Sequence, residues 1–464
     1  MIASAAVAVA RTDDPNPHPH RMSFSDDGGI GKNMLQSKRT RHIIFLLPVK
    51  NALAKREGFE YLAYAPESGS AFLCTSAAVE KIEQELAEDG KSFPCKFFPN
   101  GKKTQTMLPH SPDDFCKLTI IPSLSCNFSC TYCYAAQGRS PRFIPKQTIK
   151  HGLDYFLRPE RSHKHLKIMI TGGGEPLTAW TKVEYLLDYA HQLASTNGYF
   201  LYCTIMTNGA LLDAEKILFL KKLGIHICVS FDITRCAQEK SRQHYDEVCS
   251  AITLGLELGA EMSVSATVTP DTVEELPEMF ETVRNQFSEM KNISIEPVTS
   301  NDGFPSADAA RDFYSRFLEL FYKHRDPASS QRVTCSPVDF TERHISRCCP
   351  GKLCLTPQGD FSICHCVSSP HEKRYAESIY GSIDRYGHVR FDLRKFTSLL
   401  DKGRNSEERC KNCFAKYNCG GMCLTRAACY SQEIMSVYCD FIRNFVQHEL
   451  ESRCLREGKS CCLF

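Results

Sequence analysis

The sequence predicts an α/β protein built around a partial (β/α)6 TIM-like barrel, with a small N-terminal α+β module and a cysteine-rich C-terminal domain. Three observations lead to this fold class. Six β-branched runs alternate with amphipathic helical stretches between about residues 115 and 300, a hairpin-like segment precedes them, and fifteen of the 25 cysteines follow residue 334. Apolar strands that alternate with helices favour a parallel sheet buried on both faces.

The predicted strands of the barrel are residues 117–122, 166–171, 201–206, 225–230, 262–268 and 293–298. Apolar side chains recur at helical spacing between them, for example in residues 182–194. Asp213 is expected to cap a further helix, and Gly224 is expected to end it.

The N-terminal module is expected in residues 41–112, where residues 42–52 and 59–74 alternate like hairpin strands around a Pro-Glu-Ser-Gly turn. The helix that follows would begin with Ser76 as its N-cap. An exposed strand edge here is a candidate site for capturing a leader peptide by strand addition. A packing module that binds no ligand is an equal alternative.

Five segments are therefore predicted. They are a disordered leader (1–40), the N-terminal module (41–112), the partial barrel (113–330), the cysteine-rich domain (331–445) and a C-terminal tail (446–464).

Composition excludes several functional classes. The net charge of +2, with both signs mixed along the chain, gives no reason to expect nucleic-acid binding. No run of 18 apolar residues occurs, so no membrane span is expected. No basic residue precedes the short apolar stretch at the start, which argues against a secretory signal and for a cytoplasmic protein. In that reducing compartment 25 cysteines would serve metals or catalysis rather than disulfides.

Unusual residues follow the predicted strands at the same end. A three-cysteine loop follows the first strand, GGGEP (172–176) the second and TNG (207–209) the third, while SFD (230–232) closes the fourth. Active sites of βα barrels are built from loops at the carboxyl ends of the strands. We therefore expect these segments to converge on one cleft.

The three-cysteine loop reads SCNFSCTYCY and contains Cys126, Cys130 and Cys133. Three thiolates on a four-iron cubane leave one iron without a protein ligand, and an open coordination position is typical of a reactive metal site. Taken alone, the loop also fits an incomplete zinc knuckle.

The C-x3-C-x2-C motif, with Tyr132 before its last cysteine and GGEP after the next strand, resembles the radical S-adenosylmethionine (SAM) superfamily. The resemblance implies a [4Fe-4S] cluster on Cys126, Cys130 and Cys133 whose open iron binds SAM. Reduction would then give a 5′-deoxyadenosyl radical that removes a hydrogen atom from the substrate.

The resemblance also implies residues that contact SAM. They are Tyr132, Gly173, Gly174, Glu175, Thr207, Asn208, Ser230 and Arg242. The Gly-Gly-Glu residues would offer backbone and carboxylate oxygens to the ammonium group, and Thr207, Asn208 and Ser230 would lie near the ribose. Tyr132 would lie near the adenine, and Arg242 would pair with the carboxylate. Relatives often read SFDG, with a second glycine before the next tyrosine, whereas this chain reads SFDITRCAQEKSRQHY. Asp232 in this segment is either a helix cap or a catalytic group, and no catalytic residue is assigned.

The C-terminal cysteines form a second pattern, C-x2-C-x5-C-x3-C, followed by Cys439 and preceded by Cys349-x9-Gly359-x4-Cys364. This resembles the SPASM domain of radical SAM peptide maturases, which holds two auxiliary [4Fe-4S] clusters. The outer cluster is implied to have the ligands Cys410, Cys413, Cys419 and Cys439, and the inner cluster Cys349, Cys364 and Cys423. A zinc ribbon is the alternative, because C-x2-C also binds zinc.

The fourth ligand of the inner cluster stays open at this point. Cys348, Cys354 and Cys335 are candidates, and an open iron is a further alternative. Cys366, Cys429 and Cys454 match no motif. Four thiolates on each cluster would suit an electron relay.

The predicted function is that of an oxygen-sensitive enzyme that crosslinks or oxidises a residue of a ribosomally made peptide. Its implied partners are a precursor peptide or protein substrate and an electron donor such as flavodoxin or ferredoxin, without nucleic acid or membrane. Sulfatase maturation, in which an aspartate acts as base, is a second class. A zinc-binding adaptor without enzymatic activity is a third.

Overall fold

The computed structural model describes residues 34–36, 43–87, 109–299, 304–326, 329, 331–336, 344–345, 347–401, 408–421, 423, 430–458 and 460–462. Most of the predicted leader lies outside the described residues.

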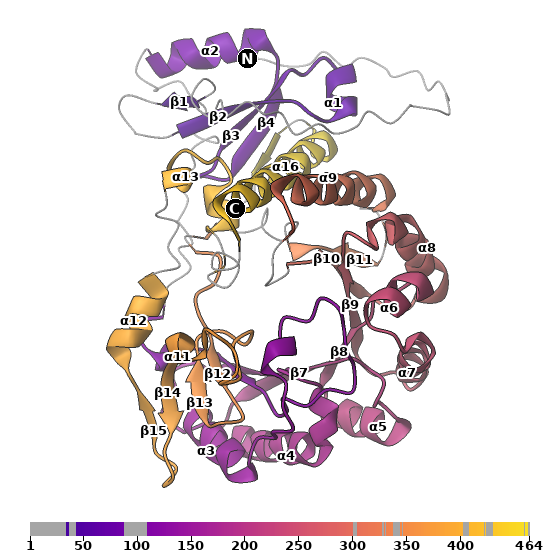
Figure 1. The fold of residues 1–464 in the computed structure, drawn as a ribbon. Coiled ribbons are helices and arrows are strands. Elements are labelled where there is room, and N and C mark those ends of the chain that lie inside the picture. Colours follow the sequence, from indigo (N-terminus) through magenta and orange to yellow (C-terminus); the bar gives the residue numbers. More distant parts are fainter. Residues whose placement is uncertain are drawn as a thin grey trace.

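A long curved sheet forms the centre of the molecule (Figure 1). Its parallel strands follow the spatial order β11 (Arg332–Thr334), β10 (Asn292–Pro297), β9 (Met262–Val268), β8 (His226–Ser230), β7 (Phe200–Thr207), β6 (His165–Ile170), β5 (Lys117–Ile120) and β12 (Leu353–Leu355). The six strands predicted from the apolar runs are β5 to β10, and their parallel pairing confirms the α/β fold class. Strands β11 and β12 extend the sheet at both edges, which the sequence analysis did not foresee.

Helices connect the parallel strands and lie outside the curve of the sheet (Figure 1). They are α3 (Lys146–Phe156), α4 (Trp180–Thr196), α5 (Ala214–Lys222), α6 (Arg235–Ser241), α7 (Tyr245–Glu257), α8 (Leu276–Gln286) and α9 (Ala307–His324). Asp213 caps α5 by accepting a hydrogen bond from Lys216 N, and Gly224 follows the helix at φ +65°. Both predicted helix ends are therefore confirmed.

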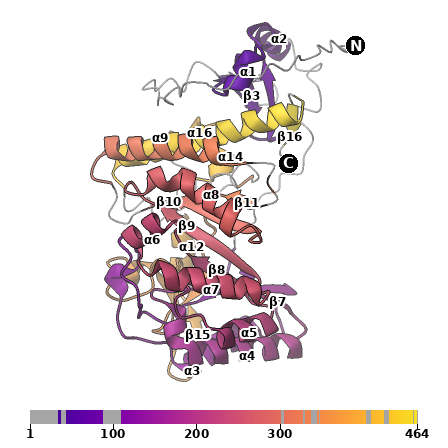
Figure 2. The same cartoon turned by 90° about the vertical axis from the view of Figure 1, so that its right-hand side faces the viewer.

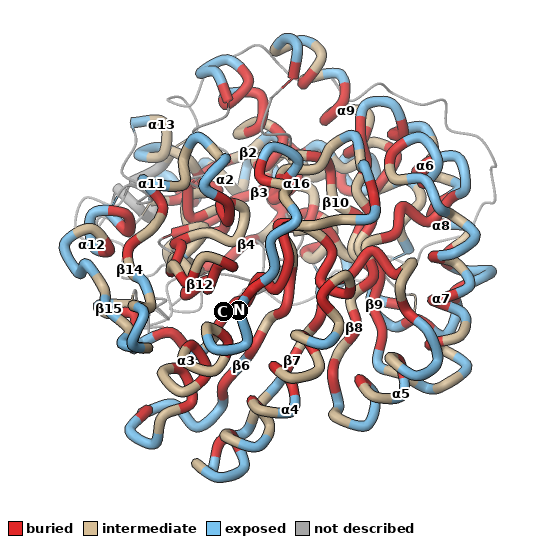
Figure 3. The backbone as a smooth tube through the Cα atoms, turned by 60° about the horizontal axis from the view of Figure 1, so that its bottom comes forward, coloured by how far each residue is buried: buried red, intermediate tan, exposed pale blue. Residues whose placement is uncertain are grey.

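Burial alternates along the middle strands, so only one face of them is sealed (Figure 3). Ile227 and Val229 of β8 are buried in the same core as Ile217 and Leu220 of α5. Cys228 and Ser230, on the other face of β8, are only partly buried. On these strands the prediction of a sheet buried on both faces needs correction, because side chains on the second face are only partly buried.

The C-terminal region continues the same sheet beyond β12 with antiparallel strands β13 (Asp360–Ser362), β14 (Ile379–Ile383) and β15 (Val389–Phe391). Short helices α11 (Tyr375–Ser378) and α12 (Leu393–Asp401) lie beside these strands (Figure 1), while α13 (Glu408–Lys411) and α14 (Lys416–Cys419) belong to the cysteine-rich segment. The predicted boundary at residue 330 therefore separates segments that share one hydrogen-bonded sheet.

The N-terminal module is a second, antiparallel sheet in the order β1 (Met34–Gln36), β2 (Ile43–Pro48), β3 (Tyr61–Ala65), β4 (Ser70–Cys74) and β16 (Ser460–Cys462). Helices α1 (Ala52–Arg56) and α2 (Ser76–Ala87) belong to it. The expected cap of α2 is off by one residue, because Thr75 rather than Ser76 accepts hydrogen bonds from Ala78 N and Val79 N. The outer edges of β2 and β4 are paired with β1 and β16, so neither is free for strand addition.

Helix α16 (Gln432–Arg456) joins the N-terminal module to the rest of the chain (Figure 2). Its buried Glu451 accepts hydrogen bonds from the backbone N–H groups of Lys50 and Asn51, at 3.0 and 2.7 Å. Tyr64 of β3 donates a buried hydrogen bond of 2.8 Å to Asn418 of α14. The predicted boundary at residue 445 therefore falls inside one continuous helix. Across the described ranges, no helix is both long and apolar enough to span a membrane.

Candidate functional site

The three-cysteine loop lies at the carboxyl ends of the parallel strands. Thr131 N donates to Ser241 O at 2.9 Å, which ties the loop to the end of α6. The sulfurs of Cys126, Cys130 and Cys133 interact electrostatically with one another, so the loop brings the three thiols together. Burial raises the pKa of Cys126 and of Cys130, and the neighbouring thiols add to this rise. A bound cation that accepts thiolates would remove that cost, so the donor set fits a metal cluster.

The GGGEP segment packs directly on this loop. Gly174 N donates to Ser123 O at 3.0 Å, and Glu175 N donates to Ser125 O at 2.8 Å. A Cβ atom at Gly174 would lie 2.0 Å from Ser125 O, so only glycine permits this approach of the two backbones. Gly174 was predicted to let a ligand approach the backbone. In this structure it is the backbone of the three-cysteine loop that approaches Gly174 closely.

The Glu175 carboxylate links the GGGEP and TNG segments. It is buried, and it accepts hydrogen bonds from Leu177 N (2.9 Å), Thr207 Oγ1 (2.7 Å) and Asn208 N (2.7 Å). Burial raises the pKa of Glu175, although these three donors act in the opposite direction. Protein donors therefore occupy most of its acceptor capacity, and the role of this side chain as a SAM ligand stays a prediction.

Tyr132 and Arg242, which are partly buried, form one network with the fully buried Asp232. The Tyr132 hydroxyl donates to the Asp232 carboxylate at 2.8 and 3.0 Å, and Arg242 Nε lies 3.5 Å from Asp232 Oδ2 and donates to the Tyr132 oxygen. Thr267 N also donates to Asp232, at 2.9 Å. Burial would lower the pKa of Arg242, but Tyr132, Asp232 and Cys130 together raise it above its ordinary value.

This network assigns Asp232 a role that the sequence left open. Asp232 does not cap α6, because Thr234 accepts the hydrogen bond from Ala237 N. Its carboxylate instead faces Arg242, whose Nη1 lies 3.8 Å from Cys130 Sγ. Asp232 therefore orients a guanidinium group toward the cysteine loop.

Three further residues at the loop were missed by sequence reasoning. Arg139 Nη2 donates to Cys133 Sγ at 3.3 Å, and Arg139 Nε is buried without a hydrogen-bond partner. Asn127 accepts a hydrogen bond of 2.9 Å from Asn208 Nδ2, and Tyr134 donates one of 3.1 Å to Gly172 O. No spacing rule marks single polar residues such as these. A buried, partly unpartnered cation beside thiols fits an anionic iron–sulfur cluster.

The segment that departs from relatives has two residues with left-handed backbone conformations where glycines are often found. Ile233, which follows SFD, has φ +69°, and His244, which precedes Tyr245, has φ +61°. Glycine adopts this left-handed region at little cost, whereas a β-branched residue there is strained. His244 is held by stacking on Phe128 of the cysteine loop, with ring centroids 4.6 Å apart. This stacking therefore stabilises a left-handed backbone conformation that glycine would adopt without such support.

The C-terminal cysteines separate into two neighbourhoods. The Cys419 sulfur interacts with that of Cys348 and with those of Cys439, Cys413 and Cys410, the other members of the predicted outer set. The Cys349 sulfur interacts with those of Cys364 and Cys423, which is the predicted inner set. None of the seven motif cysteines forms a disulfide. These interactions are consistent with the two implied sets, which stay predictions.

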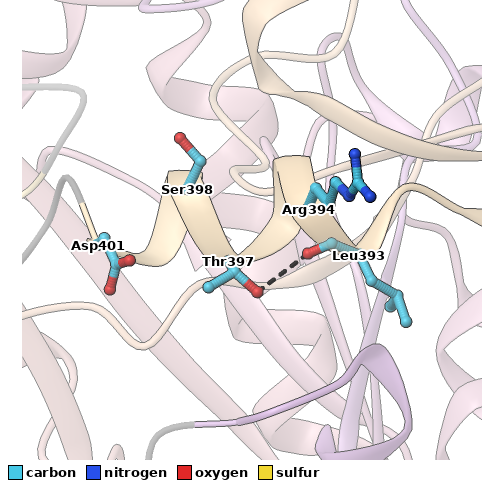
Figure 4. Close-up of a pocket in the computed structure, with 5 residues that line it drawn as sticks. All are labelled: Leu393, Arg394, Thr397, Ser398 and Asp401. Atoms are coloured by element: carbon cyan, nitrogen blue, oxygen red, sulfur yellow. Dashed lines mark hydrogen bonds between the residues drawn. The ribbon is translucent and has the colours of Figure 1, made fainter.

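A surface hollow lies on α12, apart from these residues (Figure 4). It is lined by one helix alone, through Leu393, Arg394, Thr397, Ser398 and Asp401. Thr397 Oγ1 donates to the Leu393 carbonyl at 3.0 Å within the helix. The hollow contains no residue of the predicted site.

Residues 120–283 match the radical SAM superfamily. Protein MJ0907 of Methanocaldococcus jannaschii, described as uncharacterized, is 31% identical over 107 residues, which are 23% of this chain and 35% of that protein. The radical SAM cyclopropyl synthase TigE of Paramaledivibacter caminithermalis is 24% identical over 151 residues, 29% of this chain and 31% of that protein. The chain therefore spans about a third of the length of the curated relatives it matches.

The fold resembles that of solved structures of anSMEcpe. The structure with bound AdoMet (SAM) has a TM-score of 0.59 at 17% identity and covers 73% of this chain and 98% of that one. The structure with AdoMet and the Kp18Cys peptide has a TM-score of 0.60 at 17% identity and covers 73% of this chain and 99% of that one. These comparisons show that the chain contains a radical SAM domain, and that superfamily uses a [4Fe-4S] cluster and SAM.

Proposed function

Because residues 120–283 form a radical SAM domain, we propose that this chain is a radical SAM enzyme with two auxiliary clusters that modifies a peptide or protein side chain. One observation carries the proposal. The thiols of Cys126, Cys130 and Cys133 converge in a loop that packs on the GGGEP segment, at the carboxyl ends of the parallel strands.

When bound, the cluster and SAM supply a carbon-centred radical that abstracts a hydrogen atom from the substrate. The chain's own residues prepare the site for that group. Arg139 and Arg242 place positive charge beside Cys133 and Cys130, which offsets the negative charge of thiolates and sulfides. Asp232 and Tyr132 fix the direction of the Arg242 guanidinium. Thr207 and Asn208 are held in place by Glu175.

A peptide substrate is supported by the relatives. AnSMEcpe, which shares the fold, has been solved with AdoMet and a peptide, and TigE, which matches part of the chain, is named a cyclopropyl synthase. We therefore place the substrate of this chain among ribosomally made peptides, with crosslinking or oxidation as the reaction. Electrons would come from a carrier such as flavodoxin or ferredoxin.

Sulfatase maturation is less well supported, because it calls for an aspartate that acts as base. Asp232, the aspartate in the segment after β8, accepts hydrogen bonds from Tyr132 and Thr267 and faces Arg242. Burial raises the pKa of Asp232, whereas Arg242 and these hydrogen bonds act in the opposite direction. The hydrogen bonds also occupy lone pairs that a base would offer to the substrate.

The decisive experiment is anaerobic. Purified, reconstituted and reduced protein should convert SAM into 5′-deoxyadenosine, whereas the Cys126→Ala, Cys130→Ala, Cys133→Ala triple variant should not and should retain its auxiliary iron. Mass spectrometry of a peptide co-expressed from a neighbouring gene then identifies the modified residue. Cleavage of SAM by the triple variant would refute the assignment of the loop. A preparation that contains zinc and no acid-labile sulfide would favour the zinc-binding adaptor.

A further inference from the structure

The inner auxiliary cluster of the proposed enzyme lacks an assigned fourth thiolate. The motif supplies Cys349, Cys364 and Cys423, whose sulfurs form one neighbourhood. The identity of the fourth ligand decides whether the inner cluster keeps an open iron. The assignment of this ligand rests on the proposed function. The candidates are cysteines that the motif leaves unassigned.

Cys348 lies with the outer set rather than the inner one. Its sulfur interacts with that of Cys419, and its backbone N–H donates to Gly420 O at 2.7 Å. The outer set already has four thiols, Cys410, Cys413, Cys419 and Cys439. The outer cluster, beside which Cys348 lies, therefore needs no further thiolate ligand.

Cys335 interacts with a glutamate of β10, whereas the Cys354 sulfur interacts with that of Cys364 but belongs to a paired strand. The Cys335 sulfur is buried and donates to Oε2 of Glu296 in β10 at 3.8 Å. Cys354 is fully buried in the middle of β12, in a small apolar cluster with Ile121 and Leu124. Its backbone pairs with Thr119 of β5 on one side and Ser362 of β13 on the other. Moving Cys354 toward a cluster would break both strand pairings.

Cys366 lies in the loop after β13, beside the inner set. Its backbone N–H donates to Cys364 Sγ at 3.4 Å, and its own sulfur interacts with those of Cys364 and Cys423. The ligand atoms of Cys364, His365 and Cys366 all lie within 4.8 Å of one another. No strand pairing holds residues 364–366, so this loop can adjust around a cluster.

His365 is placed to support a Cys366 thiolate rather than to bind iron itself. Lys352 Nζ lies 2.7 Å from His365 Nδ1, and a lysine ammonium can only donate, so Nδ1 is the acceptor. The remaining nitrogen, Nε2, then carries the proton, and it lies 3.6 Å from Cys366 Sγ. Hydrogen bonds to cluster sulfurs of this kind tune reduction potential.

We propose that Cys366 supplies the fourth thiolate of the inner auxiliary cluster and that His365 donates a hydrogen bond to its sulfur. The inner cluster is then fully ligated by Cys349, Cys364, Cys366 and Cys423. Full ligation leaves no iron free to bind substrate, so this cluster transfers electrons.

The test uses full-length protein that carries the Cys126→Ala, Cys130→Ala and Cys133→Ala substitutions, so that only auxiliary clusters contribute iron. This parent should contain about 8 Fe per chain, as two four-iron clusters require. Adding Cys366→Ala should reduce iron to about 7 with a [3Fe-4S] signal in electron paramagnetic resonance, or to about 4 where the cluster is lost. The matched controls Cys348→Ser and Cys354→Ala should keep the iron and the spectrum of the parent. His365→Phe should keep the iron and shift the midpoint potential of one cluster.

Unchanged iron and an unchanged spectrum in the Cys366→Ala variant would overturn the inference, as would loss of one cluster in Cys348→Ser or Cys354→Ala alone. A parent without iron and sulfide would instead refute the proposed function, so the two failures are distinguishable. If Cys366→Ala is insoluble, alkylation of the parent decides the question. Cys366 should be unreactive while iron is bound and reactive after chelation, and labelling of Cys366 in the iron-replete parent would contradict the assignment.

Discussion

Replacing Glu175 tests whether its carboxylate holds the site together before SAM binds. The structure shows two hydrogen bonds to Oε1, from Leu177 N and Thr207 Oγ1, and one to Oε2, from Asn208 N. If these bonds are its main role, Glu175 variants lose stability in the absence of SAM. If the carboxylate serves mainly as a SAM ligand, the SAM-free protein keeps its stability and only the affinity for SAM falls.

The magnitude follows from the donors that each substitution leaves unpaired. Glu175→Gln keeps an oxygen for Leu177 and Thr207 but turns an NH2 group toward the Asn208 N–H, which leaves one buried donor unsatisfied at a cost of about 1–2 kcal/mol. Glu175→Ala removes the acceptor of two backbone N–H groups, at a cost of about 4 kcal/mol. Relief from burying a carboxylate offsets part of this, so we expect a net loss of about 3 kcal/mol.

Thermal unfolding of anaerobic, SAM-free protein, followed by circular dichroism, measures the effect. A loss of about 3 kcal/mol should lower the midpoint of Glu175→Ala by about 3 °C, and Glu175→Gln should lie between this variant and the wild type. Glu289→Gln, on an exposed side chain, is the matched control and should stay within about 1 °C. The reasoning fails if Glu175→Ala unfolds within about 1 °C of wild type while SAM binding is lost.

Four further outcomes are expected. Cys413→Ala should leave some SAM cleavage but abolish modified product, since an outer-set ligand is lost; full product yield in mass spectrometry would count against an electron relay. Arg139→Gln should lower the midpoint potential of the loop cluster, because a cation 3.3 Å from Cys133 Sγ is removed, and an unchanged potential in a spectroscopic titration would contradict this. Burial lowers the pKa of His448 from 6.5 to about 4, so the unfolded state takes up the proton first and stability falls as pH drops from 6.5 toward 4. His448→Phe, which keeps a ring on Tyr322, should flatten that fall in unfolding midpoints measured at several pH values, and an equally steep fall would refute the assignment. Gln243→Gly should stabilise the protein by up to about 1 kcal/mol, since exposed Gln243 has φ +66°, whereas a loss of stability would show that its backbone is not strained.

Local patterns in the sequence were sufficient for the six central strands of the barrel and for the ends of α5. The apolar runs located β5 to β10, and Asp213 and Gly224 marked the two ends of α5. These features depend on neighbours a few residues apart, which the sequence displays directly. The cap of α2 was misplaced by one residue because Thr75 and Ser76 both have a capping hydroxyl.

Contacts between distant residues could not be read in this way. Tyr132 and Asp232 are 100 positions apart, and Glu451 binds the backbone of Lys50 across 401 positions. Such pairs form only when separate loops meet at the carboxyl ends of the strands or when a helix packs on another sheet. The residue spacing within each of the two segments does not predict that they will be in contact.

The sequence thus determined where the central strands lie along the chain and which cysteines form motifs. Both depend on apolar period and cysteine spacing, which are local properties of the chain. Only the tertiary structure decided that Glu175 binds protein donors, that Asp232 directs Arg242, and that Cys366 lies beside the inner set. The physical reason is that hydrogen bonds and charge interactions act over a few ångströms in space, whatever the distance along the chain.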